Sequence, residues 1–296
     1  MKVLNFGSLN LDYVYRVKEF VQPGETLAVL SQEVLAGGKG LNQSVALARA
    51  GAEVYHAGLY GKGGELLKQT LTDSGVHTEY LLSSEELQGN AVIQVNDKGE
   101  NCILLYGGSN QCITEQQIEE TLSHFSAGDY LVLQNEINHL PLIVDKAYAI
   151  GMKIVLNPSP FNEKLNDVDF GKLSWIFVNE IEAKQLSGFD DADAAYAAIH
   201  RRYPDLSVLI TLGKAGSVAY TNGERCVQPI FDVKVVDTTA AGDTFTGYFI
   251  ASVMQQLPLS DAMKRATAAS SIGVSRKGAS PSIPTSQEVT EFLNNR

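Results

Sequence analysis

Residues 130–160 read YLVLQNEINHLPLIVDKAYAIGMKIVLNPSP, and this stretch decides the fold class. It contains a short apolar run at 130–133, a helical apolar pattern over 141–150 that Gly151 ends, and a second apolar run at 153–156. Apolar runs of this length predict buried strands, and the longer periodic segment predicts a helix. A strand, a helix and a strand in this order predict two parallel strands joined by a right-handed crossover.

The same alternation continues through the second half of the chain. Apolar runs recur at 175–178 and 208–211, with helical patterns between them. We therefore expect an α/β fold, a three-layer sandwich in which helices cover both faces of a central, mostly parallel sheet. Ligands bind to such sheets beyond the carboxyl ends of the strands. Polar residues follow the apolar runs, and we expect them to share one rim: residues 135–136, 157, 179–180 and 211–213.

Two segments interrupt this alternation, at about 12–36 and 90–107. They contain period-two patterns such as residues 91–95, followed by the turn signal at 96–99. These patterns predict antiparallel strands that lie outside the parallel sheet and form a small β lid over its active rim. Because no Pro/Gly/Ser linker divides the chain, we expect residues 1–296 to form a single domain that carries this lid.

The composition narrows the class of protein. The chain has 296 residues, of which 44% are hydrophobic and 19% charged, as in a soluble globular protein. Its net charge of −11 argues against nucleic acid or an anionic membrane as a partner, because both require a basic face. The three cysteines form no CxxC pair, no apolar run is long enough to span a bilayer, and the first residues resemble a strand rather than a signal peptide. We therefore expect a cytoplasmic protein.

A turn of small residues, Val236 to Gly247 (VDTTAAGDTFTG), precedes a helical apolar pattern over 244–257. A helix N-terminus offers unpaired N–H groups and a positive dipole end, which together suit a phosphate. Asp243 is expected at this terminus. It either caps the helix or acts as a base beside a bound phosphate, and the local pattern leaves both interpretations open.

A glycine-rich turn at 36–40 leads into a predicted helix over 41–50. It is not a Walker A loop, because no Ser or Thr follows Lys39 at the required spacing. One interpretation is an ordinary glycine turn with a solvated lysine. The other is a close approach of the backbone to a small ligand, with Lys39 and Asn42 donating to its hydroxyl groups.

Polar residues elsewhere fit the second interpretation. Asn10 and Asp12 follow the first predicted strand two residues apart, so both point the same way from an extended backbone. An Asx-type turn at the strand exit is the alternative. Glu136 follows the strand at 130–133, and the alternative interpretation is a carboxylate at the rim with no ligand. Together with Lys39 and Asn42, these residues supply the donors and acceptors that a polyol needs.

Residues 37–43 (GGKGLNQ) and 237–245 (DTTAAGDTF) resemble the two signature motifs of the ribokinase-like (phosphofructokinase-B) sugar kinases. The similarity extends nearly from end to end, including residues 7–12, 179–182 and 275–282, and is strongest to the ribokinase branch. The resemblance implies an ATP-dependent transfer of the γ-phosphate to the 5-hydroxyl of D-ribose. It also implies a homodimer in which the lids of two subunits pack together.

The resemblance assigns roles to individual residues. Asp243 matches the general base, and the backbone N–H groups of Ala241, Gly242 and Asp243 match the anion hole. The ribose-binding positions are matched by Asn10, Asp12, Gly38, Lys39, Asn42 and Glu136, with Leu105 as an apolar contact from the lid. The nucleotide-binding positions are matched by Asn179, Thr211, Gly213, Gly216, Gly242 and Thr267.

The resemblance further implies two metal sites. Asn179 and Glu182 match the NxxE motif, which organises Mg²⁺ through water. A loop that holds a monovalent cation, usually potassium, is matched by Asp237, Thr239, Gly273, Arg276, Gly278 and Ser282. Without the resemblance, this loop is an ordinary Gly/Pro/Ser segment after a helix.

Two other functions remain open at the level of sequence. The same reaction on another pentose, a ketohexose or a nucleoside would use the same motifs. A non-catalytic regulator that binds a sugar or nucleotide would share the fold, although the intact Asp243 turn argues against it.

Overall fold

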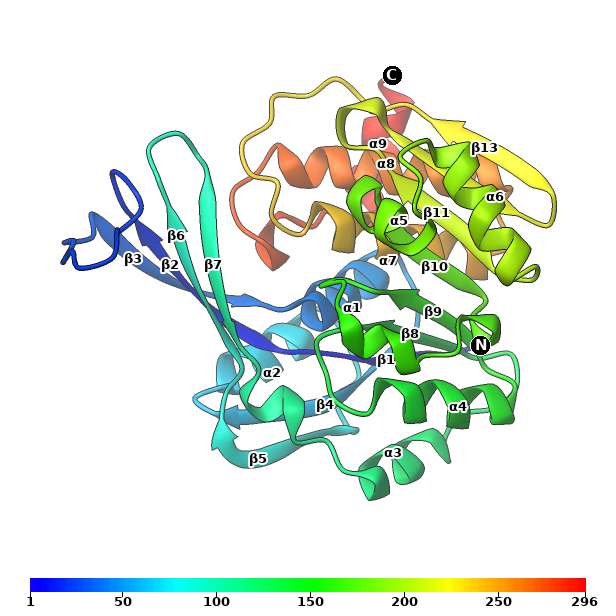
Figure 1. The fold of residues 1–296 in the computed structure, drawn as a ribbon, viewed down its shortest axis with the longest axis horizontal. Coiled ribbons are helices and arrows are strands. Elements are labelled where there is room, and N and C mark those ends of the chain that lie inside the picture. Colours follow the sequence, from blue (N-terminus) through cyan, green and yellow to red (C-terminus); the bar gives the residue numbers. More distant parts are fainter.

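In the computed structural model, which describes residues 1–296, a large mostly parallel sheet forms the centre of the molecule (Figure 1). Its strand order is β13-β12-β11-β10-β9-β8-β1-β4-β5. All neighbouring pairs from β11 to β5 are parallel, and β12 and β13 are added antiparallel. The strands are β1 (Val3–Phe6), β4 (Val54–Lys62), β5 (Leu81–Leu87), β8 (Tyr130–Gln134), β9 (Lys153–Asn157), β10 (Trp175–Asn179), β11 (Ser207–Thr211), β12 (Ser217–Thr221) and β13 (Glu224–Gln228).

Helices cover both faces of this sheet, and a separate hydrophobic core lies between the sheet and the helices on each face. One core contains side chains of α1, α2, α7, α8 and α9, and the other contains side chains of α3, α4, α5 and α6. Successive strand residues alternate between the cores: Val132 enters the first, and Leu131 and Leu133 enter the second. The helices are α1 (Lys39–Arg49), α2 (Glu65–Asp73), α3 (Glu115–Leu122), α4 (Leu140–Ile150), α5 (Glu180–Ser187), α6 (Ala192–Arg202), α7 (Ala241–Met254), α8 (Leu259–Val274) and α9 (Ser286–Asn294).

This arrangement confirms the expected three-layer α/β fold. The predicted strand–helix–strand unit is β8, α4 and β9, and Gly151 ends α4 in the left-handed conformation with φ 88°. The later apolar runs form β10 and β11. No helix combines the length and the apolar composition that a bilayer span requires.

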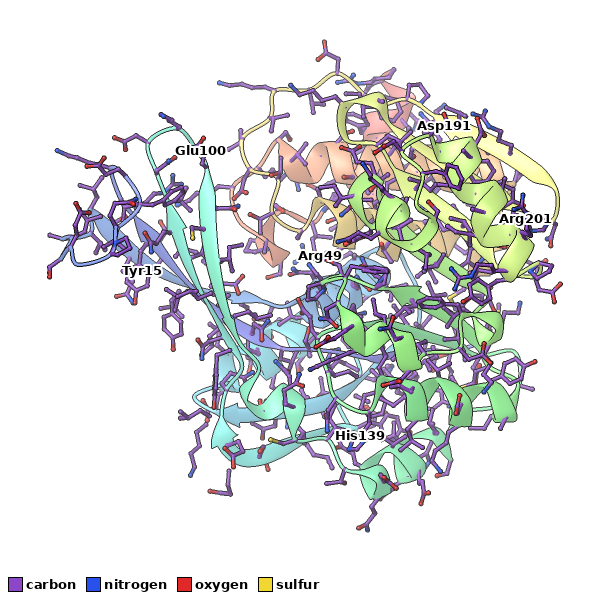
Figure 2. The ribbon with its side chains drawn as sticks, viewed as in Figure 1. Tyr15, Arg49, Glu100, His139, Asp191 and Arg201 are labelled. Carbon is purple, nitrogen blue, oxygen red and sulfur yellow. The ribbon has the colours of Figure 1, made fainter.

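A second, small sheet projects from the body, at the left of Figure 1. It has the order β3-β2-β6-β7, made of β2 (Asn10–Arg16), β3 (Ser31–Gly37), β6 (Asn90–Val95) and β7 (Asn101–Tyr106). Tyr15 on β2 and Glu100 in the β6–β7 turn mark its position in Figure 2. This β2–β3–β6–β7 unit is called the small sheet below.

The expectation of purely antiparallel strands in the small sheet is wrong at one pair. β2 and β3 pair antiparallel, as do β6 and β7, but β2 and β6 are parallel from Leu11↔Asn90 to Arg16↔Val95. The physical reason is that both hairpins leave the body in the same direction. Their first strands, β2 and β6, are the ones that meet.

The helix predicted at 244–257 begins and ends three residues earlier, as α7. Ala240 adopts the left-handed conformation (φ 60°), so the helix begins at the next residue. Gln256 also has a positive φ, 58°, which prevents the helix from continuing through 257. Asp243 therefore lies inside the first turn of α7 rather than before it.

Candidate active site

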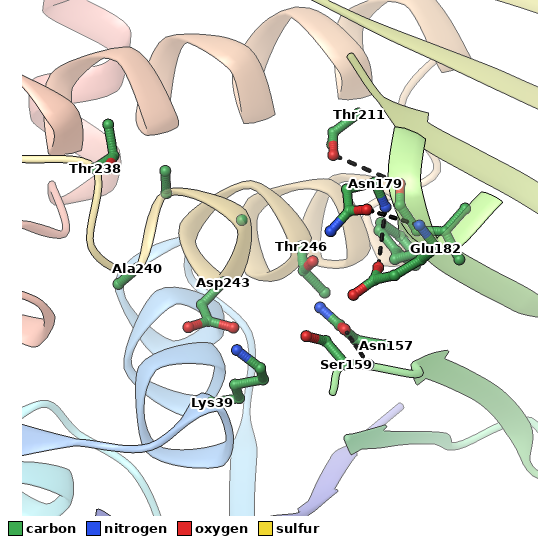
Figure 3. Close-up of a pocket in the computed structure, with 14 residues that line it drawn as sticks. Lys39, Asn157, Ser159, Asn179, Glu182, Thr211, Thr238, Ala240, Asp243 and Thr246 are labelled. Carbon is green, nitrogen blue, oxygen red and sulfur yellow. Dashed lines mark hydrogen bonds between the residues drawn. The ribbon is translucent and has the colours of Figure 1, made fainter. Parts of the chain in front are cut away.

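A cavity of about 350 Å³ opens at the carboxyl ends of the central strands. Asn157, Asn179 and Thr211, at the ends of β9, β10 and β11, line one side of it, as the expected shared rim requires. The first turn of α7 and Lys39 at the start of α1 line the other side (Figure 3). Three hydroxyl-bearing residues that the sequence did not single out also line it: Ser159, Thr238 and Thr246.

Asp243 is almost completely buried, with 8% of its surface exposed. Its Oδ2 accepts a hydrogen bond from Asn42 Nδ2 at 3.1 Å, and its Oδ1 accepts one from Gln43 Nε2 at 2.9 Å. The N-cap of α7 is Ala240, and no side chain caps the helix. The interpretation of Asp243 as a helix cap is therefore wrong: its carboxylate faces α1 and the cavity.

The backbone at the start of α7 offers two unpaired donors. The amide of Ala241 donates to the carbonyl of Thr238 at 3.2 Å, but the amides of Gly242 and Asp243 make no hydrogen bond with the protein. The positive end of the helix dipole lies at the same place. Of the three expected anion-hole donors, two are free to bind an anion.

Lys39 provides a positive charge at the edge of the cavity. Its Nζ lies 4.0 Å from Glu136 Oε1, and Figure 3 shows it pointing toward the Asp243 carboxylate. Burial lowers the pKa of Lys39, but the surrounding carboxylates outweigh burial and raise the pKa above its ordinary value. Those carboxylates are, in decreasing order of effect, Asp243, Glu136, Glu182 and Asp12. Lys39 is thus cationic at neutral pH.

Glu136 is held in place by Ser8, in the loop after β1, and by the start of α1. One oxygen, Oε2, accepts hydrogen bonds from the Ser8 hydroxyl and from the Lys39 amide, the latter at 3.2 Å. Its other oxygen faces the Lys39 ammonium.

Asn10 and Asp12 lie on β2 and are both buried, and neither forms an Asx turn. Asn10 Oδ1 accepts from Asn110 Nδ2 at 2.8 Å, a partner that the sequence did not indicate. Burial, followed by the charge of Glu136, raises the pKa of Asp12 to about 7, with Lys39 opposing and Asp243 adding to the shift.

The glycines of the 36–40 turn make room for the protein's own residues. A Cβ at Gly37 would collide with the Asp12 carboxylate. Gly38 has φ 94°, and a Cβ there would lie 2.9 Å from the Asn10 amide nitrogen. The turn therefore packs closely against β2, and its close approach to a ligand stays a prediction.

Asn179 and Glu182 form a capping box at the start of α5. Asn179 Oδ1 accepts from the Glu182 amide at 2.9 Å, and Glu182 Oε2 accepts from the Asn179 amide at 3.0 Å. Glu182 Oε1 has no hydrogen bond within the protein and is directed toward the cavity (Figure 3). No group of three or more His, Cys, Asp or Glu residues forms a metal cage. A single free carboxylate oxygen fits Mg²⁺ held mainly through water and phosphate.

The loop expected to hold a monovalent cation is closed by Asp237. Its Oδ1 accepts from the amide and hydroxyl of Thr239 at 2.9 and 2.7 Å, and its Oδ2 accepts from the Gly278 amide at 3.0 Å. Burial raises the pKa of Asp237, but these hydrogen bonds outweigh it and leave the pKa below its ordinary value.

Three further loop positions lie nearby. A Cβ on Gly273 would lie 3.9 Å from the carbonyl oxygen of Ser282. The Arg276 guanidinium is directed at Glu288, 2.6 Å away, so only its backbone is available to the loop. Carbonyl oxygens beside an ionised carboxylate fit a potassium-sized cation.

Most of the residues expected to bind the sugar or the nucleotide lie outside the cavity lining. Gly213 and Gly216 flank a short 3₁₀ turn after β11, and Thr267 is buried in α8 with its hydroxyl unpaired. Leu105 is half exposed on β7. The sugar positions Asn10, Asp12, Gly38, Asn42 and Glu136 also do not line it. The charges of Asp12 and Glu136 act on Lys39, which does line it.

Comparisons with known proteins find relatives over nearly the whole chain. The model of the pfkB family carbohydrate kinases matches residues 1–286. The ribokinase of Haemophilus influenzae is 36% identical over 297 residues, which cover 97% of this chain and 96% of that protein.

Two solved structures share the fold over nearly their whole length. The ribokinase of Cryptococcus neoformans in complex with ADP has a TM-score of 0.87 and 33% identity, covering 98% of this chain and 99% of that one. The Arabidopsis thaliana ribokinase complexed with ribose and ATP has a TM-score of 0.87 and 28% identity, covering 99% and 98%. The chain therefore belongs to the pfkB family of carbohydrate kinases.

Proposed function

We propose that this chain is an ATP-dependent kinase that transfers the γ-phosphoryl group to the 5-hydroxyl of D-ribose. One observation carries the proposal: a buried carboxylate, Asp243, lies in the same helical turn as two unpaired backbone amides. A base for a hydroxyl and donors for a phosphoryl group are thus adjacent. Relatives of similar length are named ribokinases, and one was solved with ribose and ATP.

In this mechanism Asp243 accepts the proton of the sugar hydroxyl as its oxygen attacks the γ-phosphorus. The bond from that phosphorus to the bridging oxygen breaks, and ADP leaves. The amides of Gly242 and Asp243 and the Lys39 ammonium stabilise the negative charge on the transferred group. Phosphoryl transfer depends mainly on such positioning and charge stabilisation.

Asn42 connects the base to the sugar. Its Nδ2 donates to Asp243, and its Oδ1 is buried without a partner. A buried acceptor without a donor is costly, so a substrate hydroxyl is the natural donor. The other sugar contacts in this proposal come from Asn10, Asp12, Gly38, Lys39 and Glu136, with Leu105 from the small sheet.

The nucleotide would bind along the rim from Asn179 and Thr211, with Gly213, Gly216, Gly242 and Thr267 as further contacts. Mg²⁺ would be held by Glu182 through water and would neutralise charge on the phosphates. K⁺ would be held by Asp237, Thr239, Gly273, Arg276, Gly278 and Ser282, where it would order the loop beside the anion hole.

The small sheet would act as a lid that excludes water, since an open site would hydrolyse ATP. All six residues of β7 are exposed, and Leu104 is 68% exposed. An exposed apolar edge strand of this kind is a surface on which another chain can pair. We propose that the small sheets of two copies pack together in a homodimer.

The three cysteines are unpaired, which suits the reducing cytoplasm.

Three experiments test the proposal. Asp243→Asn should lower kcat by about 10²–10⁴-fold while sugar and ATP still bind; an unchanged kcat would refute the base. A coupled ADP assay with D-ribose, other pentoses, ketohexoses and nucleosides tests the substrate. Strong turnover of another compound without ribose activity would favour the same chemistry on that compound, and binding without turnover of any would favour a regulator. The same assay in potassium and in a bulky organic cation tests the cation loop, which predicts a higher rate in potassium.

A further inference from the structure

A row of buried amide side chains runs from Asp243 into the centre of the sheet. Gln43 donates from Nε2 to Asp243 Oδ1 at 2.9 Å and accepts at Oε1 from Gln134 Nε2 at 2.7 Å. Gln134 Nε2 also donates to Asn5 Oδ1 at 3.1 Å. Gln43, Gln134 and Asn5 are each 0% exposed. None of the three is accessible to a substrate, so any effect on the reaction passes through Asp243.

The far end of the row is anchored in the first strand and helix. Asn5 Nδ2 donates to the Gly40 carbonyl at 2.8 Å and to Ser44 Oγ at 2.9 Å. Ser44 Oγ is hydrogen bonded to His56 Nδ1 at 2.8 Å. Burial lowers the pKa of His56 to about 3, so this end of the row is neutral. Gly7 packs tightly against the Gln134 side chain, because a Cβ at Gly7 would lie 2.6 Å from Gln134 Oε1.

The polarity of the row admits one arrangement. An amide carries its donor and its acceptor on different atoms, and a carboxylate only accepts. Gln134 Nε2 presents a donor to Gln43, so Gln43 must turn its oxygen there and its nitrogen toward Asp243. The reverse orientation would place an amide oxygen against the carboxylate. The direction of every bond in the row is therefore set from Asn5 outward.

We propose that Gln43 is a positioning residue for the general base: it fixes the orientation of the Asp243 carboxylate and stabilises its ionised form, while Gln134 and Asn5 fix Gln43. The inference rests on the proposed role of Asp243. Asn42 cannot serve this purpose alone, because its Oδ1 has no partner in the protein and is expected to gain one when a sugar binds. Gln43 has both polar atoms engaged inside the protein.

The first test replaces Gln43 by Met, which has a similar length and no polar atoms. We expect kcat to fall about 10–100-fold with less than about a 3-fold change in the KM for ribose, because a misoriented base affects the reaction more than binding. Gln117→Met is the matched control: Gln117 is buried and donates to the Gly58 carbonyl at 2.9 Å, away from the cavity. This control should keep the wild-type kcat.

The second readout is the pH dependence of kcat, which a purely structural role would not move. The charged side chains that act on Asp243 are Lys39 and Asp12, and both remain in these variants. Loss of the amide donor disfavours the ionised base, so the acidic limb should move to higher pH in Gln43→Met. Gln43→Glu places a second carboxylate in contact and should move the limb further, by at least about 1 pH unit.

Gln134→Met provides an independent variant if Gln43→Met does not fold. It should lower kcat in the same direction, and the double variant should lose no more than Gln43→Met alone, since Gln134 acts through Gln43. A folded Gln43→Met enzyme with wild-type kcat and acidic limb would overturn the inference. If Asp243→Asn itself retains kcat, the proposed base fails instead, so the two failures are distinguishable.

Discussion

Asp12 is the residue whose ionisation the fold changes most clearly in the site. Its pKa rises from an ordinary value of 3.8 to about 7, first because of burial and then because of Glu136. The folded protein thus binds the Asp12 proton more tightly than the unfolded chain does. Between these pH values the unfolded chain loses the proton first, so the free energy of unfolding falls as pH rises, and the cost is complete above about pH 7.

We therefore predict that Asp12→Asn stabilises the protein at about pH 8 but not at about pH 4. The gain at the higher pH is at most about 4 kcal/mol. Urea unfolding of both proteins across this range measures it. Asp205→Asn changes the charge equally at an exposed position and should leave the pH dependence unaltered. A constant difference between wild type and Asp12→Asn at all pH values would contradict the prediction.

At the scale of elements, the N-termini of α5 and α7 determine which groups face the cavity. α7 begins after a left-handed alanine and leaves two amides free, whereas α5 begins with a complete capping box. The Asn179–Glu182 box therefore has two roles: it stabilises α5, and it directs Glu182 Oε1 toward the cavity. The Asn179–Glu182 motif, which the resemblance associates with Mg²⁺, thus forms the N-terminal capping box of α5.

Asn179→Ala should separate these roles. Loss of the cap should cost about 1 kcal/mol of unfolding free energy. The freed Glu182 and the lost Asn179 contact should together raise the KM for Mg-ATP several-fold. Thr114→Ala is the matched control, because Thr114 caps α3 by accepting from the Gln117 amide. It should lose similar stability with an unchanged KM. Equal KM values in the two variants would show that Asn179 acts only as a cap.

At the scale of the whole molecule, the small sheet projects from the body and exposes an apolar strand. Lys277, in the loop proposed to hold potassium, donates to both carboxylate oxygens of Glu33 on β3, at 2.6 and 2.9 Å. Ile103, Leu104 and Leu105 on β7 are each at least half exposed. The apolar strand is the surface that we propose a second copy covers.

Leu104→Glu should weaken the homodimer by at least ~10-fold, because it places an unpaired charge in an apolar interface. Sedimentation velocity over a range of protein concentrations measures the change. Leu66→Glu introduces the same charge at an exposed position of α2, 47% exposed, and should leave the association state unaltered. A wild-type protein that is monomeric at all concentrations would refute the dimer.

The predictable part of the molecule is the part governed by local pattern. The runs at 130–133, 153–156, 175–178 and 208–211 became β8 to β11, because short apolar segments between breakers have few alternatives to a buried strand. The start of α7 was misplaced by three residues, because a left-handed Ala240 has no signal in composition. The parallel β2–β6 pair was missed, because strand direction depends on how distant hairpins leave the body.

The sequence by itself determined the α/β class, the two motifs and the candidate base, since periodicity and motif spacing are local properties of the chain. Only the tertiary structure decided that Asp243 is held by α1 rather than capping α7, and that Gln43, Gln134 and Asn5 stand behind it. Asn5 and Gln134 lie 129 positions apart in the chain. Contacts across such separations are set by sheet register and packing, which no local pattern specifies.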